Sequence, residues 1–279
     1  MLLKRLPGIL PPLSNEELIE TLKVKSLVTQ QGLTTFSLCR PFRSPHHSIS
    51  YAGLVGGGKN PRPGEISMAH NGVLFLDELP EFQRNVVEVL RQPLEDHSVT
   101  LSRANYSYTY PARFMLVAAM NPCPCGYFKD PLQECYCSTS HITKYWKKIS
   151  GPILDRIDII LRVPRLEKND LLDNTIVSED SESILKRVSD VRQLQMNRSG
   201  RTNSALASHQ IESECTLNAS SKTLIGEAVD SGLLSGRSYV KVLKVARTIA
   251  DMDGSCHITE AHILEALQYR KMDYSLAIH

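Results

Sequence analysis

The chain has 279 residues, with 32 Lys and Arg against 30 Asp and Glu, a formal net charge of +2 and 42% hydrophobic residues. This composition is typical of a globular protein of one or two domains, and it excludes a histone-like polycation and an acidic tail protein. The sequence contains no apolar run near the roughly 18 residues that a membrane span needs and no signal-peptide pattern, so we expect a cytoplasmic protein that does not span a membrane.

The first part of the chain alternates between predicted helices and predicted strands. A capped, amphipathic pattern predicts a helix over residues 15–28, and the stretch 40–64, rich in Pro, Gly, Ser and His, predicts a long irregular insertion. Helix signals occupy residues 81–93, and alternation around Ala104-Asn105 predicts a β-hairpin over 99–110. Short apolar runs predict buried strands at residues 72–76, 114–119 and 157–163. This order predicts an α/β fold with a parallel sheet sandwiched by helices.

The character of the sequence changes after Pro164. Residues 167–198 are charged with a helical pattern, residues 199–220 are rich in Ser and Asn, and residues 221–271 carry apolar faces at helical spacing. We therefore expect two domains, an α/β core over residues 1–166 and an all-helical domain over residues 167–279.

Two acids close the predicted buried strand at residues 72–76. In nucleotide hydrolases such a strand carries an Asp that holds Mg²⁺ through water and a Glu that polarises the attacking water. Asp77 and Glu78 stand at these positions, at the strand end where open α/β sheets bind ligands. The alternative is that Asp77 begins an ordinary turn or caps a helix near Glu81.

Two further side chains have positions that suit the same chemistry. Asn121 follows the next predicted strand and is placed to contact a γ-phosphate or to orient water. Arg156 directly precedes the predicted strand at 157–163. On its own, Arg156 is equally well explained as an ion-paired residue beside Asp155 and Asp158.

Five segments in order carry a resemblance to a known family. They are RPFRSPHHSIS at 40–50, GEISMAHNGVLFLDELPEF at 64–82, AAMNPCPCGY at 118–127, SGPILDRIDI at 150–159 and SGRSYVKVLKVARTIAD at 235–251. They resemble the magnesium-chelatase-like branch of the AAA+ ATPases, in particular its competence-associated ComM/YifB type. The resemblance implies a P-loop NTPase-type core followed by a helical lid domain, with ATP and Mg²⁺ as cofactors. It also implies a homo-oligomeric ring, expected to be a hexamer, that acts as a motor on DNA branches in natural transformation.

The resemblance also assigns roles to single residues. Asp77 and Glu78 match the Walker B acids, and Asn121 matches sensor 1. Arg156 matches the arginine finger that reaches a neighbouring subunit's γ-phosphate, and Arg237 matches the sensor 2 arginine of the lid. A guanidinium suits both arginine roles because it is permanently charged and its planar fork fits phosphate oxygens. The family pattern further places the insertion at 40–64 and the hairpin at 99–110 toward the ring pore or the substrate.

The glycine-rich phosphate loop of such an ATPase has only a poor match in this sequence. The run from Gly53 to Lys59 has the spacing, but Asn60 replaces the required Ser or Thr, and Pro61 and Pro63 follow where a helix must begin. The resemblance places the true loop just before Met1. We therefore expect a truncated chain without its first strand and Walker A motif, with weak or no ATP binding. The alternative is a non-hydrolysing regulatory or interaction subunit of an AAA+ ring. Metal chelation on a tetrapyrrole is disfavoured by the cysteine cluster and the absence of an integrin-like domain.

Four of the seven cysteines lie close together in the sequence, at Cys123, Cys125, Cys135 and Cys137. Four thiolates can close a tetrahedral structural Zn²⁺ site, and such a cluster is more typical of a reduced chain than of a disulfide scaffold. The alternatives are thiols without a metal and disulfides. His141 is a substitute ligand or, more simply, a solvated histidine.

A histidine pair and a basic, aromatic segment are further candidates for ligand contact. His46 and His47 lack a metal-site partner at suitable spacing, so contact with substrate or the pore is the preferred interpretation. Basic and aromatic residues over 144–148 favour either nucleic-acid contact or, more simply, a solvated helix face that buries only Trp146.

Overall fold

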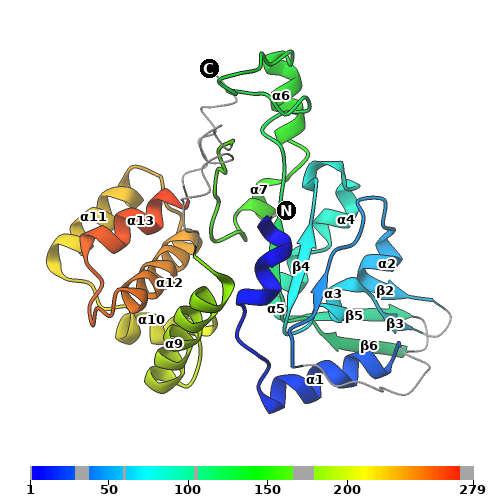
Figure 1. Ribbon diagram of the computed structural model, residues 1–279, viewed down its shortest axis with the longest axis horizontal. Helices are drawn as coiled ribbons and strands as arrows, with labels where there is room; N and C mark the ends of the chain where they lie inside the picture. Colours follow the sequence, from blue (N-terminus) through cyan, green and yellow to red (C-terminus); the bar gives the residue numbers. More distant parts are fainter. Residues whose placement is uncertain (1, 29–37, 59–60, 104–105, 166–178, 271–279) are drawn as a thin grey trace. The chain divides into compact units, whose positions relative to one another are not determined.

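The computed structural model describes residues 2–28, 38–58, 61–103, 106–165 and 179–270 (Figure 1). The chain divides into two compact units, one within Met1–Arg156 and the other within Ile157–Tyr274. Each unit has its own cluster of buried hydrophobic side chains. No helix in the described ranges is long and apolar enough to cross a membrane.

A three-stranded parallel sheet forms the centre of the first unit. Its strands are β1 (Phe42–Arg43), β4 (Val73–Leu76) and β7 (Met115–Ala118), and β4 lies in the middle. Every residue of β4 is buried, as expected for a continuous apolar run in a parallel strand. The residues of β7 are less buried, and Met115 is 41% exposed. Within the described ranges, β4 is the strand that pairs with β7.

The first unit also contains a set of mostly short helices. They are η1 (Leu2–Ile9), α1 (Asn15–Ser26), α2 (Tyr51–Val55), α3 (Glu65–Met68), η2 (Leu79–Glu81), α4 (Arg84–Glu88), α5 (Arg91–Asp96), α6 (Thr139–Trp146) and α7 (Gly151–Leu154). Helix α1 begins at a capping box in which Ser14 accepts from the backbone N–H of Glu17 and the Glu17 carboxylate accepts from that of Ser14. The core that α2, α3, α4 and α7 share with the sheet includes Leu54, Ile66 and Ile153, with Leu90 between α4 and α5, all fully buried.

Two antiparallel hairpins complete the first unit. One joins β5 (Ser98–Arg103) to β6 (Tyr106–Pro111), and the other joins β2 (Gly56–Gly57) to β3 (Arg62–Pro63). Gly56 has a φ of 109°, and a Cβ there would lie 2.3 Å from the carbonyl oxygen of Arg62. The glycine run therefore serves a tight hairpin in the described residues and does not lead into a helix that would cradle a phosphate.

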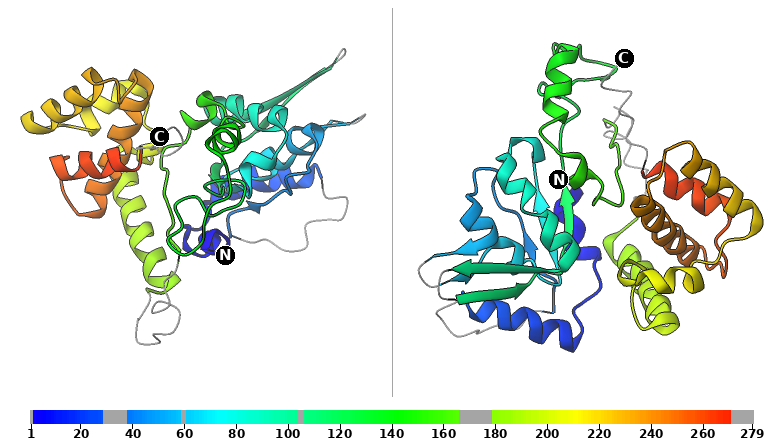
Figure 2. Two further views of the ribbon diagram at one scale, coloured as in Figure 1. Left: turned by 90° about the horizontal axis from the view of Figure 1, so that it is seen from above. Right: turned by 180° about the vertical axis from the view of Figure 1, so that it is seen from behind.

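The second unit is helical. It contains α9 (Ser181–Ser199), η3 (Asn203–Ala205), α10 (Ser208–Glu214), α11 (Ala219–Asp230), α12 (Gly236–Met252) and α13 (Glu260–Gln268). Helix α12 is central, since it contacts α9, η3, α10 and α13. Its fully buried residues Val242, Ala246 and Ala250 recur every four positions and form the core-facing stripe. Figure 2 shows both units from two further directions.

The structure confirms the expected α/β core with a parallel sheet and a helical lid region. It also confirms the helix after Ser14, the strand that ends before Asp77 and the hairpin over 99–110. The interpretation of 40–64 as irregular is wrong, because this stretch contributes edge strand β1, helix α2 and the β2–β3 hairpin. The helix expected over 81–93 is two helices, α4 and α5, with Leu90 between them.

The strand expected at 157–163 does not form in the described structure. Ile159, Leu161 and Val163 are 48%, 65% and 72% exposed, and the backbone N–H of Ile160 donates to the carbonyl of Tyr269 at 2.8 Å. An apolar run becomes a strand only where a neighbouring strand completes its hydrogen bonds. The domain boundary expected between residues 166 and 167 lies outside the described residues and stays a prediction.

Candidate nucleotide-hydrolysis site

Asp77 and Glu78 follow β4 directly. Both side chains are exposed, whereas Leu76 before them and Leu79 after them are buried. Glu78 adopts a left-handed backbone conformation with a φ of 54°, which is uncommon for a residue with a side chain. The backbone N–H of Leu79 donates to the carbonyl of Ala119 at 2.9 Å. This bond fastens the turn to the end of β7, so the turn presents two carboxylates to solvent at one edge of the sheet.

His47 contacts the second of these acids. Its Nδ1 lies 3.3 Å from Oε2 of Glu78, and its ring packs edge-on against Phe82 with 6.3 Å between the centroids. His46 packs against the other side of this arrangement, with 4.0 Å between the two imidazole centroids. The contact joins the segment after β1 to the turn after β4. Sequence reasoning missed it, although the position of His47 shortly after an edge strand was a usable signal.

Asn121 lies beyond the carboxyl end of β7 and is exposed. Since β7 runs parallel to β4, with Ala118 opposite Leu76, Asn121 and the acid pair leave neighbouring strands at the same edge. Tyr145 of α6 packs close to this edge. Burial, followed by the charge of Glu81, raises the pKa of Tyr145, and a hydrogen bond with the Asn121 backbone opposes that rise. The structure therefore brings three of the expected residues, Asp77, Glu78 and Asn121, to one side of the sheet.

Arg156 is held by groups of its own chain. Its Nη2 lies 2.7 Å from Oε1 of Glu95, and its Nη1 and Nε donate to the carbonyls of Pro152 and Arg91 at 2.6 and 3.2 Å. The side chain is only 12% exposed. These contacts place Arg156 against α5 and α7 and not beside the acid pair.

Arg237 belongs to the second unit, where it is exposed in the first turn of α12. The helix that presents it is fixed by a buried ion network. Asp251 accepts from Arg198, from Nε of Arg247 at 3.1 Å and from Nδ2 of Asn203 at 2.8 Å. The network ties α12 to α9 and η3 and so orients the helix that carries Arg237.

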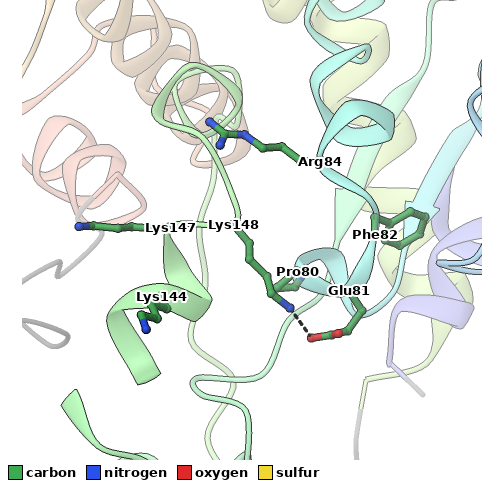
Figure 3. A pocket seen from close by; sticks show the side chains of 7 residues that line it. All are labelled: Pro80, Glu81, Phe82, Arg84, Lys144, Lys147 and Lys148. Atoms are coloured by element: carbon green, nitrogen blue, oxygen red, sulfur yellow. Dashed lines mark hydrogen bonds and ion pairs between the residues drawn. The ribbon is translucent and has the colours of Figure 1, made fainter. Parts of the chain in front are cut away.

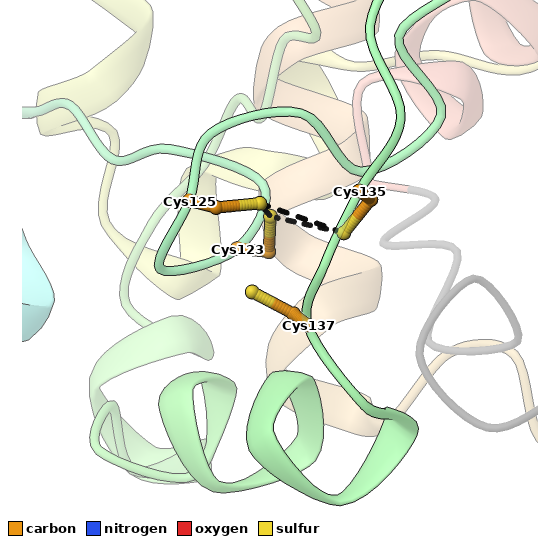
Figure 4. Close-up of side chains that lie close together, drawn as sticks. All are labelled: Cys123, Cys125, Cys135 and Cys137. Atoms are coloured by element: carbon orange, nitrogen blue, oxygen red, sulfur yellow. Dashed lines mark hydrogen bonds between the residues drawn. The ribbon is translucent and has the colours of Figure 1, made fainter.

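The four clustered cysteines converge on one point, as Figure 4 shows. The sulfur of Cys123 lies 3.3 Å from that of Cys125 and 3.7 Å from that of Cys135. The sulfurs of Cys125 and Cys135 are 3.6 Å apart, and all four sulfurs lie within 4.8 Å of one another. A tetrahedral zinc with Zn–S bonds of about 2.3 Å has sulfur–sulfur edges of about 3.8 Å. The backbone N–H of Tyr127, with neighbouring thiols, lowers the pKa of Cys125 to about 6, and the same cluster raises the pKa of Cys135 and Cys137. The donor set fits a structural tetrahedral metal ion.

A basic groove lies between the turn that follows Glu78 and the end of α6 (Figure 3). It has a volume of about 400 Å³ and is lined by Pro80, Glu81, Phe82, Arg84, Lys144, Lys147 and Lys148. Nζ of Lys148 lies 3.2 Å from Oε1 of Glu81 and links the two walls. Trp146 is half-buried and its indole N–H donates to the carbonyl of Pro122 at 3.0 Å, while Tyr145 is only 6% exposed. The expectation that this helix face buries only Trp146 is therefore wrong.

Two family models together match almost the whole chain. Residues 1–171 match the family model for magnesium chelatase, subunit ChlI, and residues 178–270 match the model for the C-terminal part of that subunit. The chain belongs to the magnesium chelatase ChlI family. Within it, the chain is 46% identical over 272 residues to competence protein ComM of Haemophilus influenzae and 46% identical over 281 residues to the uncharacterized protein YifB of Escherichia coli. These alignments cover 98% and 100% of the chain, which makes it a family member of the ComM/YifB type.

More distant relatives include magnesium chelatases themselves. The 38 kDa subunit of magnesium chelatase from Chlorobaculum tepidum is 24% identical over 213 residues, which is 76% of this chain. The chain spans about half the length of the curated relatives it matches, 53% of the Haemophilus protein and 54% of the Escherichia protein.

Proposed function

We propose that this chain provides the hydrolytic residues and the lid of an ATP-driven motor of the magnesium-chelatase-like AAA+ type. The observation that carries the proposal is the placement of Asp77, Glu78 and Asn121 at the carboxyl ends of two adjacent parallel strands. This edge is where open α/β sheets bind ligands. Two exposed carboxylates fit Mg²⁺, a hard cation that takes oxygen ligands and keeps several waters.

Each residue of the edge has a separable role in the proposed reaction. Mg²⁺, when bound, would neutralise charge on the γ-phosphoryl group of ATP. Asp77 would hold the metal, and Glu78 would orient the attacking water and accept its proton. The Asn121 amide positions that water or a γ-phosphate oxygen. The fixed left-handed turn at Glu78 and the bond from Leu79 to β7 hold these groups in one geometry, which reduces the reorganisation needed for reaction.

Arg156 and Arg237 complete the site under this proposal. A guanidinium from a neighbouring subunit stabilises charge on the transferred phosphoryl group, and Arg156 is assigned this role in a homo-oligomeric ring, expected to be a hexamer. Because Glu95 and two carbonyls now hold Arg156, ring assembly must exchange these contacts for phosphate. Arg237 is assigned to the nucleotide from the lid.

The proposed substrate of the motor is DNA, acted on in the cytoplasm. The name competence protein of the Haemophilus relative supports this assignment. The domain division proposed for the motor remains a core over 1–166 and a lid over 167–279. The 279 residues contain no G-x-x-x-x-G-K-[ST] sequence, so we expect the chain on its own to bind ATP weakly, because such a loop provides most direct phosphate contacts.

A domain exchange tests the proposal directly. This chain replaces the matching region of Haemophilus ComM, and ATP hydrolysis is measured with Mg²⁺ and with EDTA. We expect Mg²⁺-dependent hydrolysis that Asn121→Ala reduces at least tenfold. A folded, nucleotide-binding chimera without any hydrolysis would contradict the proposal. Calorimetry on the unmodified chain provides the companion measurement, and stoichiometric micromolar ATP binding would contradict the expected weak affinity.

A second candidate function is a non-hydrolysing subunit of an AAA+ ring. The observation that favours it is that the glycine run of this chain forms the β2–β3 hairpin and not a phosphate loop, whereas Arg156 and the helical unit are present. Mixing this chain with intact ComM at increasing ratios separates the two functions. A regulatory subunit changes the ATPase rate of the partner in proportion to its incorporation, and Arg156→Ala abolishes the change. A chain that leaves the rate unaltered at all ratios contradicts a regulatory role.

We further propose that the four cysteines bind one structural Zn²⁺. The closed set of four thiolates leaves no open coordination position, which is the structural and not the catalytic arrangement. Bound zinc would hold the loop over 123–137, which follows Asn121, against α6. Protein purified without chelator should contain about one zinc per chain by elemental analysis. Far less than one equivalent, with all four thiols reactive toward a thiol reagent, would contradict it.

A further inference from the structure

The basic groove is built from two segments that each follow a residue of the hydrolysis edge. One wall, Pro80 to Arg84, comes directly after Glu78, and the other comes from the end of α6. Helix α6 is in turn joined to the residue after Asn121 by the hydrogen bond from the Trp146 indole to Pro122. A ligand in the groove therefore touches elements attached to both sides of the proposed catalytic edge.

The charge of the groove is strongly positive. Four of the seven residues that line the groove are basic, and the one carboxylate among them, Glu81, is paired with Lys148. The side chains of Arg84, Lys144 and Lys147 have no hydrogen bond or ion pair with any described residue. Three unneutralised cations from two different segments make a site for an anion that is larger than a single phosphate.

The shape of the groove indicates an extended ligand. A second hollow of about 250 Å³ adjoins it and shares Glu81, Lys144 and Lys148, with His141 and Pro124 as further walls. Lys144 lies in the last turn of α6, and Lys148 follows shortly after the helix ends. The two hollows thus form one shallow path on the surface, with basic groups along it.

The chemistry of the walls selects the backbone of the ligand and not its bases. Base stacking needs exposed aromatic rings, but Phe82 and Tyr145 are each only 6% exposed, and Trp146 is half-buried with its N–H occupied. We infer that the basic groove binds the phosphate backbone of single-stranded DNA, without base preference, beside the hydrolysis edge. The inference rests on the proposed function only in taking DNA as the substrate.

Equilibrium binding of the full chain to a fluorescent thymidine 20-mer, followed by anisotropy without nucleotide, tests this inference. The slope of log affinity against log salt concentration is about 0.7 per phosphate contact for single strands. The triple variant Arg84→Gln, Lys144→Gln and Lys147→Gln should therefore reduce the magnitude of that slope by about 2 and weaken binding at least tenfold at low salt. An adenosine 20-mer should bind within about threefold of the thymidine oligomer, because stacking contributes little.

The control removes the same charge elsewhere, with Lys4→Gln, Lys23→Gln and Lys222→Gln, at three other exposed positions. It should change the slope and the affinity by less than the groove variant, and circular dichroism should show that both variants are folded. Equal losses in both variants, or no measurable binding by the parent chain, overturn the inference. Displacement of the oligomer by polyglutamate at equal charge concentration assigns the groove to an acidic protein and also overturns it. ATP hydrolysis does not enter this measurement, so its outcome is separate from that of the proposed function.

Discussion

Asp251 holds the helical unit together, and replacing it with Asn should destabilise that unit strongly. The Asp251 side chain is 1% exposed and that of Arg247 is 3% exposed. Asp251→Asn keeps the volume but removes the charge that balances the buried Arg247, whereas Arg198 keeps its ion pair with Glu214. Breaking one partner of a buried ion pair costs about 3–5 kcal/mol, because the remaining charge stays buried without compensation. That is a large part of the roughly 5–15 kcal/mol that stabilises a whole domain.

The loss is measurable by urea unfolding. With a slope of about 2 kcal/mol/M, a cost of 3–5 kcal/mol lowers the midpoint of the helical transition by about 1.5–2.5 M in circular dichroism. The chain contains one tryptophan, Trp146, which lies in the first unit, so its fluorescence transition should not move. Asp253→Asn is the matched control, because that carboxylate is 62% exposed and its loss should cost less than about 1 kcal/mol. A midpoint shift below about 0.5 M for Asp251→Asn would show that the Asp251 ion network does not stabilise the helical unit.

Asp251 also makes the stability of the helical unit depend on pH under acidic conditions. Burial alone would raise the pKa of Asp251, but hydrogen bonds from Arg198 and Asn203 and the charge of Arg247 hold it below its ordinary value of 3.8. A lowered pKa in the folded state contributes stability that is present above the unfolded pKa and is lost as pH falls through the folded pKa. The free energy of unfolding of the helical unit should therefore decline below about pH 4. Asp251→Asn should remove the part of this decline that is due to protonation of Asp251.

Two further predictions concern the first unit. Removal of zinc by a chelator should shift the fluorescence emission of Trp146 to longer wavelength, because the loop whose carbonyl accepts its N–H is no longer held by the metal, and one equivalent of zinc should restore the emission. Cys137→Ser should behave as the zinc-free protein and Cys256→Ser as the parent. Unchanged emission after zinc removal would count against the role of the metal. In the ComM chimera, His47→Ala should lower kcat by roughly tenfold to a hundredfold through loss of the contact that positions Glu78, with ATP affinity within about twofold and partial rescue by His47→Gln. A larger effect on ATP affinity than on kcat would contradict the positioning role of His47.

Patterns that are local in the sequence predicted local structure well. Ser14 followed by Glu17 specifies a capping box within three residues, and the apolar run before Asp77 specifies a buried parallel strand, so both appeared where the sequence indicated. Parallel strands end at a common edge, which is why the sequence alone predicts that Asn121 lies at the same edge as the acid pair.

Features that depend on distant partners could not be predicted in the same way. The apolar run at 157–163 has strand character, but strand formation depends on a hydrogen-bonding neighbour that sequence pattern does not supply. The contact of His47 with Glu78 and the pairing of Arg156 with Glu95 depend on how segments far apart in the chain are packed. In α6, Tyr145 is buried together with Ile142, three residues before it on the same face of the helix, whereas the sequence pattern had favoured burial of Trp146.

Under the proposed function, Glu78 activates the water that attacks ATP, and a single substitution isolates this role. In the ComM chimera, Glu78→Gln keeps the size of the side chain but removes the base. Single-turnover hydrolysis should fall by about 10²-fold or more, while the affinity for ATP with Mg²⁺ stays within about threefold. Asp77→Asn in the same chimera should instead weaken the dependence on Mg²⁺. Hydrolysis by the Glu78→Gln chimera at a rate within twofold of the parent would contradict the account.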